Sequence, residues 1–143
     1  MKIQLLLLGK TRRAEIRTLV EDYAARIRRH AAIEITELRE TSPAELRKIK
    51  IEPGARVVLL DDGGKQFTSE EFAKWLGAQR DGGARTLVFL CGGAEGFPEA
   101  LRRAAQTRIS LSKLTFSHEL ARAMLLEQIY RAFAILSGHP YPK

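Results

Sequence analysis

The chain has 143 residues, a formal net charge of +7, 45% hydrophobic and 29% charged residues, which is the composition of one ordinary globular domain over 1–143. This excludes disorder as the default, and no apolar stretch approaches the length of about 20 residues that a membrane-spanning helix needs. The single cysteine, Cys91, excludes an internal disulfide and suits a reducing compartment, so we expect a cytoplasmic protein.

The first part of the chain predicts strands and helices in alternation. A short apolar run that ends at Gly9 predicts a buried strand over 3–8. Apolar residues spaced three and four apart then predict an amphipathic helix over 13–29, and alternation with a period of two predicts a half-exposed strand over 33–38. Ser42-Pro43-Ala44-Glu45 predicts a helix start, because it combines an N-cap serine, a proline at the first helical position and a glutamate three residues on.

The alternation continues through the second part. A strand is expected over 56–60, closed by a turn at 61–64, and the capping box Thr68-Ser69-Glu70-Glu71 predicts a helix with Phe72, Trp75 and Leu76 on its inner face. The remaining expected elements are a strand over 86–90, a helix from Pro98 to about 106, a strand over 109–112 and the longest helix over 118–136, with Leu120, Met124, Leu125, Ile129, Phe133 and Leu136 on its apolar stripe. This order predicts an α/β fold with a mainly parallel sheet covered on both faces.

Three loops follow strand ends, where ligands bind in open α/β sheets; they come after Leu60, Leu90 and Ser112. The loop Gly92-Gly93-Ala94-Glu95-Gly96 has three glycines in five residues, which indicates either close backbone approach to a ligand or a tight turn. Its spacing is not that of a dinucleotide fingerprint. Gly9-Lys10-Thr11 lacks the upstream glycine of a phosphate-binding P-loop.

Charge is concentrated at both ends of the chain, where residues 1–50 hold 12 Lys and Arg against 7 Asp and Glu, and residues 101–143 hold 7 against 2. This distribution favours a polyanionic partner. On the last helix, His118 and Arg122 lie one turn apart, as do Glu127 and Arg131; the second pair could equally be an ordinary surface ion pair. The tail His139-Pro140-Tyr141-Pro142 carries aromatic rings of the kind that stack on unpaired bases.

Several motifs occur together in the order found in one known family. They are the Gly92–Gly96 loop, Leu111-Ser112-Lys113-Leu114-Thr115-Phe116 with His118 and Arg122, Glu127-Gln128-Ile129-Tyr130-Arg131-Ala132, and the terminal His139-Pro140-Tyr141. With these motifs the whole chain resembles the RlmH family of SPOUT-class methyltransferases. The resemblance implies an α/β-knot fold with a C-terminal trefoil knot, which is a rare exception to unknotted topology. It also implies S-adenosyl-L-methionine as cofactor, and a homodimer with shared active sites.

The resemblance further implies a reaction and a set of site residues. The reaction is methylation of N3 of a pseudouridine in a 23S rRNA stem-loop on the assembled 70S ribosome, with no metal and no membrane involved. The expected cofactor-binding residues are Leu60, Gly92, Gly93, Gly96, Leu111, Ser112, Lys113, Leu114, Thr115 and Phe116; the expected catalytic residues are His118, Glu127, Arg131, His139 and Tyr141; and the expected RNA-binding residues are Arg122, Arg131 and Lys143.

One position departs from the family pattern, since Pro142 stands where the tail usually has a second histidine. A general base at that position is therefore not expected, and the role would fall to His118 or His139. Two alternatives remain open at this point. One is a non-catalytic ribosome-binding or assembly factor, and the other is a SPOUT enzyme that acts on tRNA.

Overall fold

The computed structural model of the chain describes residues 1–39, 44, 49–93 and 96–141. The elements are, in chain order, β1 (Lys2–Leu8), α1 (Ala14–Ile27), β2 (Ala32–Leu38), β3 (Arg56–Gln66), α3 (Ser69–Asp81), β4 (Thr86–Cys91), α4 (Glu99–Ala104), β5 (Thr107–Ser110) and α5 (His118–Ser137). They confirm the predicted succession of strands and helices. The helix start expected at Ser42-Pro43-Ala44-Glu45 lies outside the described residues, apart from position 44.

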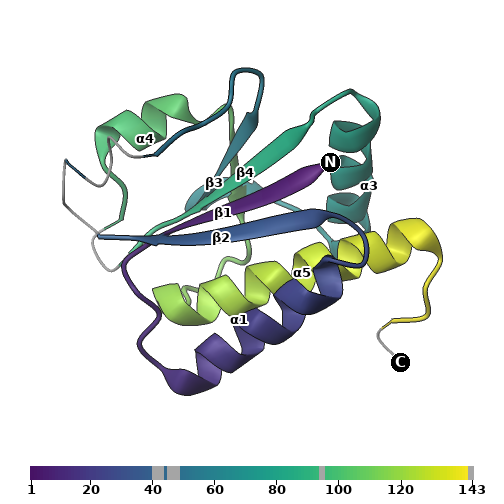
Figure 1. Ribbon diagram of the computed structural model, residues 1–143, viewed down its shortest axis with the longest axis horizontal. Coiled ribbons are helices and arrows are strands. Elements are labelled where there is room, and N and C mark those ends of the chain that lie inside the picture. Colours follow the sequence, from purple (N-terminus) through teal and green to yellow (C-terminus); the bar gives the residue numbers. More distant parts are fainter. Residues whose placement is uncertain (40–43, 45–48, 94–95, 142–143) are drawn as a thin grey trace.

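Five strands form one sheet in the order β2-β1-β4-β3-β5, and every neighbouring pair is parallel, as the sequence predicts (Figure 1). The register pairs Lys2 with Ala32 on one side of β1 and with Thr86 on the other. Because all strands run the same way, the loops that follow β1, β3, β4 and β5 leave the sheet at one edge.

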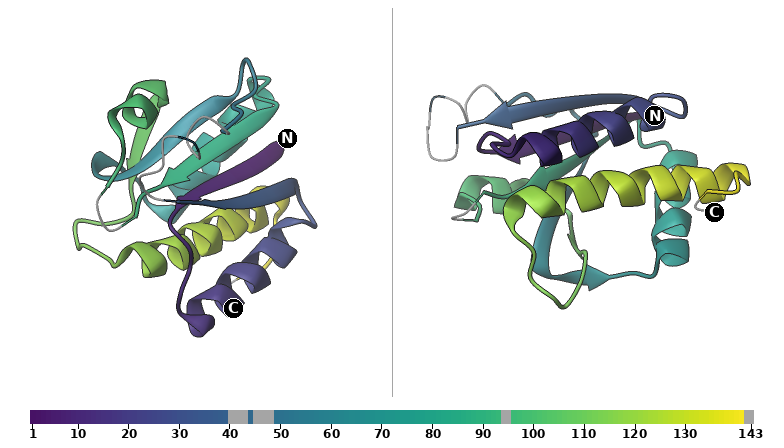
Figure 2. Two further views of the ribbon diagram at one scale, coloured as in Figure 1. Left: turned by 60° about the vertical axis from the view of Figure 1, so that its left-hand side comes forward. Right: turned by 90° about the horizontal axis from the view of Figure 1, so that it is seen from below.

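Alternate residues of each strand enter two separate cores, one on each face of the sheet. Leu5 of β1 and Phe89 of β4 pack with the buried faces of α1, α3 and α5 on one side. Leu6 and Leu90 pack with α4 and with apolar residues near Ile51 on the other side. Figure 2 shows α1 and α5 lying side by side across the first of these faces. Helices therefore cover both faces, as predicted.

Helix ends agree with the sequence signals where these are strongest. At the start of α3 the Thr68 hydroxyl accepts a hydrogen bond from the Glu71 amide, and the Glu71 carboxylate accepts one from the Thr68 amide. The last helix, α5, begins after the N-cap Ser117 and ends at Gly138, whose φ of 73° a glycine adopts without steric cost.

The predicted apolar stripe of α5 is wrong at two positions. Leu120 and Met124 are each 40% exposed, whereas Leu125, Ile129 and Phe133 are buried. The cause is that apolar residues of α5 occupy more of its circumference than the sheet, α1 and α3 can cover. Leu120 and Met124 lie on the uncovered side.

The predicted turn at 61–64 is also wrong, because β3 continues to Gln66. The pairing of β3 with β5 shifts register between Leu60 and Lys65, so the intervening residues form an irregular, bulge-like stretch within a long strand. A Cβ atom on Gly64 would lie 2.6 Å from the Ile109 backbone nitrogen. The glycine is thus required by close strand contact, which local sequence cannot distinguish from a turn.

We predict that Gly64→Ala destabilises the fold by roughly 1–3 kcal/mol, because the added methyl group must displace the backbone of β5. Gly63→Ala is the matched control: its Cβ would come no closer than 3.8 Å to the Asp61 carboxylate, and we expect a change within about 0.5 kcal/mol. Urea unfolding of both variants measures the difference. Equal stabilities for the two would contradict the role assigned to Gly64.

Candidate functional site

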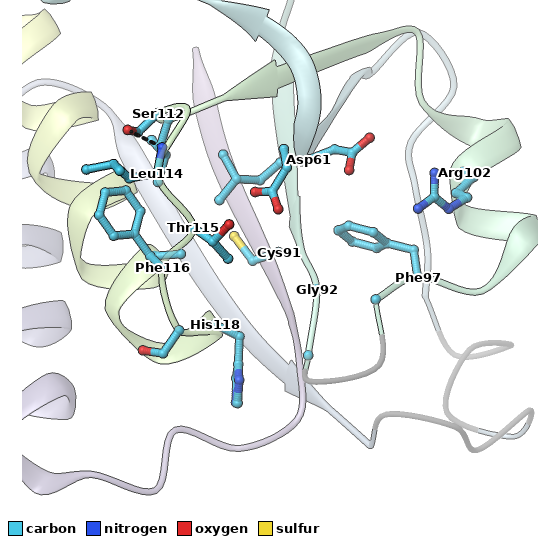
Figure 3. Close-up of a pocket in the computed structure, with 17 residues that line it drawn as sticks. Asp61, Cys91, Gly92, Phe97, Arg102, Ser112, Leu114, Thr115, Phe116 and His118 are labelled. Carbon is cyan, nitrogen blue, oxygen red and sulfur yellow. Dashed lines mark hydrogen bonds between the residues drawn. The ribbon is translucent and has the colours of Figure 1, made fainter.

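A cavity of about 440 Å³ opens at the carboxyl edge of the sheet, between the irregular stretch of β3 at Leu60–Asp62, the loops after β4 and β5, and the start of α5 (Figure 3). The structure thus brings together the three segments singled out in the sequence, although the first of them lies within β3 and not in a loop. Of the residues expected to bind a cofactor, those that line the cavity are Leu60, Gly92, Gly93, Gly96, Leu111, Ser112, Leu114, Thr115 and Phe116. Lys113 is exposed and does not line it, and His118 lines it from the first turn of α5.

Further lining residues were missed by the sequence analysis: Asp61, Asp62, Cys91, Phe97, Arg102, Ser117 and Ala121. The two aspartates lie in the irregular stretch of β3 directly after Leu60, and their position beside one of the three predicted ligand-binding segments was the available signal. Asp61 accepts a hydrogen bond from the Arg108 guanidinium at 3.2 Å. Burial raises the pKa of the Cys91 thiol to about 12, so this thiol stays protonated and is no nucleophile at neutral pH.

The glycine loop combines a turn with close packing. Gly96 has a φ of 80°, and its amide donates to the Gly93 carbonyl at 3.2 Å, which closes the turn. A Cβ on Gly92 would lie 3.2 Å from the Phe97 ring, which itself lines the cavity. Gly96 thus fits the interpretation of a tight turn, whereas Gly92 is required by its contact with Phe97; approach of the backbone to a ligand stays a prediction.

The loop after β5 is held by its own serines. The Ser110 hydroxyl donates to the Ser112 carbonyl at 2.9 Å, and the Ser112 hydroxyl accepts from the Leu114 amide at 2.9 Å. The Leu114 side chain is 74% exposed at the cavity. These hydrogen bonds hold the loop so that the apolar Leu114 side chain is available to a ligand in the cavity.

Arg122 does not lie where its predicted role in RNA binding requires. Its side chain is fully buried, and its guanidinium donates to the Leu8 carbonyl at 2.7 Å and to the Thr11 hydroxyl at 2.9 Å. A buried guanidinium needs such acceptors because desolvation of a charge is costly. Arg122 thus joins α5 to the end of β1, and this placement contradicts a direct contact with RNA.

Glu119 holds the start of α1 from the neighbouring helix. Its carboxylate accepts hydrogen bonds from the backbone amides of Arg12 at 3.0 Å and Arg13 at 2.9 Å. Arg13 is the N-cap of α1, so Glu119 satisfies the amide of the N-cap residue and that of the residue before it. The hydrogen bond from the Arg13 amide is the main cause that lowers the pKa of Glu119; the Arg12 amide, His118 and Arg122 add to it and burial opposes it.

Three of the residues expected to be catalytic meet at the other end of α5; we call Tyr23, Glu127, Tyr130, Arg131 and Tyr141 the tail cluster. The Arg131 guanidinium donates to Glu127 at 3.0 Å, and the Tyr141 hydroxyl donates to the same carboxylate at 2.9 Å. The Tyr141 ring lies edge-on to Tyr130, with centroids 4.7 Å apart, and its hydroxyl is 3.4 Å from that of Tyr23. The tail is thereby packed against α1 and α5.

Protonation states in the tail cluster follow from these contacts. Burial, then the hydrogen bonds to Tyr23 and Glu127, raise the pKa of Tyr141 well above its ordinary value, so it remains a donor. The hydrogen bond to Glu127 raises the pKa of Arg131 further above neutrality. His139 is exposed, and its Nδ1 accepts from the Tyr141 amide at 3.2 Å. Lys143 lies outside the described residues.

The expected catalytic residues therefore fall in two places. His118 lies at the cavity, whereas Arg131 is 13 positions further along the same helix, about 20 Å away at a rise of about 1.5 Å per residue. Within one chain, the tail cluster does not reach the cavity.

In the part of the chain that the structure describes, no helix combines the length and the apolar composition of a membrane span. No group of three or more His, Cys, Asp or Glu side chains in that part is arranged to hold a metal ion.

The chain is similar to known proteins over nearly its whole length. The family model described as "Predicted SPOUT methyltransferase" matches residues 1–142. Proteins named ribosomal RNA large subunit methyltransferase H are 45% identical in Geobacter sp. strain M21, covering 99% of this chain and 98% of that protein, and 42% identical in Geotalea daltonii, covering 99% of each. The crystal structure of the SpoU methyltransferase AviRb from Streptomyces viridochromogenes in complex with AdoMet is 12% identical, with a TM-score of 0.51, over 96% of this chain and 61% of that one. This last likeness concerns the fold.

We predict that the contribution of Glu119 to stability depends on pH. Because its pKa is lowered on folding from 4.5, the contribution is fully present above about pH 4.5 and is lost as pH falls through the lower folded value. Glu119→Gln keeps an oxygen that can accept from the two amides but removes the charge. Urea unfolding should show the variant less stable than the wild type at pH 7, with the gap narrowing towards pH 3. A gap that does not vary with pH would contradict this role for the charge.

Proposed function

The chain belongs to the SPOUT methyltransferase family, and from that premise we propose that it methylates ribosomal RNA of the large subunit, with S-adenosylmethionine as the methyl donor. In full, the proposal is methyl transfer to N3 of a pseudouridine in a 23S rRNA stem-loop on the 70S ribosome, in the cytoplasm. The observation that carries it is the cavity built by the irregular stretch of β3 together with the loops after β4 and β5. The printed name of the 45% and 42% identical relatives and the net charge of +7 support the RNA substrate.

The cavity suits the donor in size and chemistry. Its volume of about 440 Å³ is in the usual range for small-molecule sites. Leu60, Leu111 and Phe116 offer apolar surface for an adenine ring, and Asp61 offers carboxylate oxygens for hydroxyl or ammonium groups. No side chain at Gly92 occupies the space beside Phe97. When bound there, the donor supplies an electrophilic methyl group on a sulfonium.

The protein must then hold the target base in line with the methyl group and accept the proton that N3 loses. Positioning of this kind is worth roughly 7–11 kcal/mol in favourable cases. A neutral His118 at the cavity, or the Glu127 carboxylate, is suited to accept the N3 proton, and Arg131 is suited to stabilise the negative charge that remains on the base. Tyr141, kept protonated, is suited to donate a hydrogen bond to the base.

The distance between these groups favours a shared site. Since Arg131 lies about 20 Å along α5 from His118 in the same chain and no residue of the tail cluster lines the cavity, a second copy must bring its own tail cluster to the cavity for both groups to act on one base. The exposed Leu120 and Met124 on α5 are the kind of apolar surface that a homodimer buries. The trefoil knot and the single domain over 1–143 stay predictions.

The test is methyl transfer from labelled S-adenosylmethionine to 70S ribosomes, 50S subunits, naked 23S rRNA and total tRNA, all from cells that lack their own copy of the enzyme. We expect incorporation that maps to N3 of one pseudouridine and is strongest on 70S particles. Transfer to tRNA alone would contradict the proposal that rRNA is the substrate. No transfer, with no rise in melting temperature when the donor is added, would overturn the enzymatic function in favour of an assembly factor.

Shared active sites predict complementation between two inactive variants. Gly92→Leu fills the cavity beside Phe97, and Arg131→Met removes the cation of the tail cluster. Each homodimer should be inactive, whereas co-expressed variants should recover about a quarter of wild-type activity, because about half the dimers are mixed and each mixed dimer keeps one of two sites. Activity is measured on 70S particles. No recovery, with mixed dimers present by mass spectrometry, would contradict sharing.

A further inference from the structure

The loop between β1 and α1 carries exposed positive charge; we call Lys10, Thr11, Arg12 and Arg13 the basic loop. The Lys10, Arg12 and Arg13 residues are exposed, while Thr11 is only 1% exposed. The segment Gly9-Lys10-Thr11 does not complete a P-loop. In the structure, the basic loop instead presents three exposed cationic side chains on a backbone that is held by hydrogen bonds from other elements.

The anchoring is extensive. The Thr11 hydroxyl accepts from the buried Arg122, its amide donates to Glu37 at 3.3 Å, and its carbonyl accepts from Arg17. The next two amides of the loop donate to Glu119, as described above. Successive backbone groups of the loop are thus held by side chains from β2, α1 and α5. A loop fixed in this way loses little conformational entropy when it binds a partner.

The negative groups near the basic loop are turned to its backbone, with one exception. Glu37 and Glu119 both accept from loop amides. The exception is Glu15, whose carboxylate lies 3.5 Å from the Arg13 Nε in an exposed ion pair. Such exposed pairs contribute little free energy. Within the part of the chain that the structure describes, Lys10 and Arg12 form no ion pair. Two exposed cations are therefore available to an external anion.

The basic loop lies next to the cavity. Glu119, which holds the loop, is the immediate neighbour of His118, which lines the cavity. Figure 3 shows the N-terminal strand continuing into this loop beneath His118. The loop is thereby placed close to the route by which a nucleotide would enter the cavity.

We propose that the basic loop binds the phosphodiester backbone of the substrate RNA beside the target nucleotide, mainly through Lys10 and Arg12. The proposal rests on the proposed function and names a part of its RNA interface. Phosphate suits both side chains, since the arginine guanidinium binds its oxygens in a bidentate manner and the lysine ammonium acts as a compact charge. Such contacts orient the substrate without reading its sequence.

The test compares two double variants with the same net charge. Lys10→Gln/Arg12→Gln removes the two cations of the basic loop. Arg56→Gln/Arg85→Gln removes two exposed cations at the opposite edge of the sheet, at or just before the starts of β3 and β4. For each, kcat/KM for 70S ribosomes is measured from 50 to 200 mM salt, together with KM for S-adenosylmethionine and the melting temperature.

We expect the loop variant to lose roughly tenfold in kcat/KM for ribosomes, and its log–log salt slope to become shallower by about 1.4, because each contact with a single strand contributes about 0.7. Its KM for S-adenosylmethionine and its melting temperature should match those of the wild type. The Arg56 and Arg85 control should keep the wild-type slope.

Equal losses in both double variants would overturn the inference, because they would show an effect of total charge. Wild-type kcat/KM and slope in the loop variant would also overturn it, and would leave the proposed function intact. Failure of the wild-type protein to methylate any RNA would instead overturn the proposed function, and the inference with it.

Discussion

One buried charge determines how the parts of the site are arranged. The Arg122 guanidinium lies among the end of β1, the loop after it and α5, and it is fully buried. Since a desolvated cation is tolerated only with acceptors in place, the Leu8 carbonyl and the Thr11 hydroxyl must stay where they are. This requirement sets the position of the first turns of α5 against the sheet. His118 is thereby held at the cavity, and Glu119 under the start of α1.

The parallel sheet and the long last helix each position a different group of candidate site residues. Parallel strands gather the irregular stretch of β3 and the loops after β4 and β5 at one edge, and so build a cavity from segments that are far apart in the sequence. The helix then carries a second group of polar side chains, none of which lines that cavity; its Arg131 lies about 20 Å along the helix from His118. Tyr141 and Arg131 share the Glu127 carboxylate, so the tail is ordered within its own chain before any partner is met.

Where sequence reasoning succeeded and failed has physical reasons. The spacing of apolar residues and the helix-capping signals predicted the strands and α3 correctly, because both reflect local geometry. The rule that ligands bind beyond the carboxyl ends of parallel strands predicted the place of the cavity. The extension of β3 was missed because Gly64 is needed for contact with a distant strand. Arg122 was assigned to the surface because nothing local reveals that a β1 carbonyl will receive it. The separation of His118 from Arg131 follows from helical rise and could be read from their positions in the sequence.

The strand order also affects how the chain folds. The central strand β4 pairs with β1 and β3, yet it follows β1 by more than seventy residues. During synthesis, β1 and β2 can pair early, but the other edge of β1, with the apolar run Leu5 to Leu8, stays unpaired until β4 has left the ribosome. High contact order of this kind slows folding, and until β4 pairs with β1 it leaves an aggregation-prone strand edge exposed. The interval between synthesis of β1 and of β4 is therefore the period in which this chain is most open to aggregation through that edge.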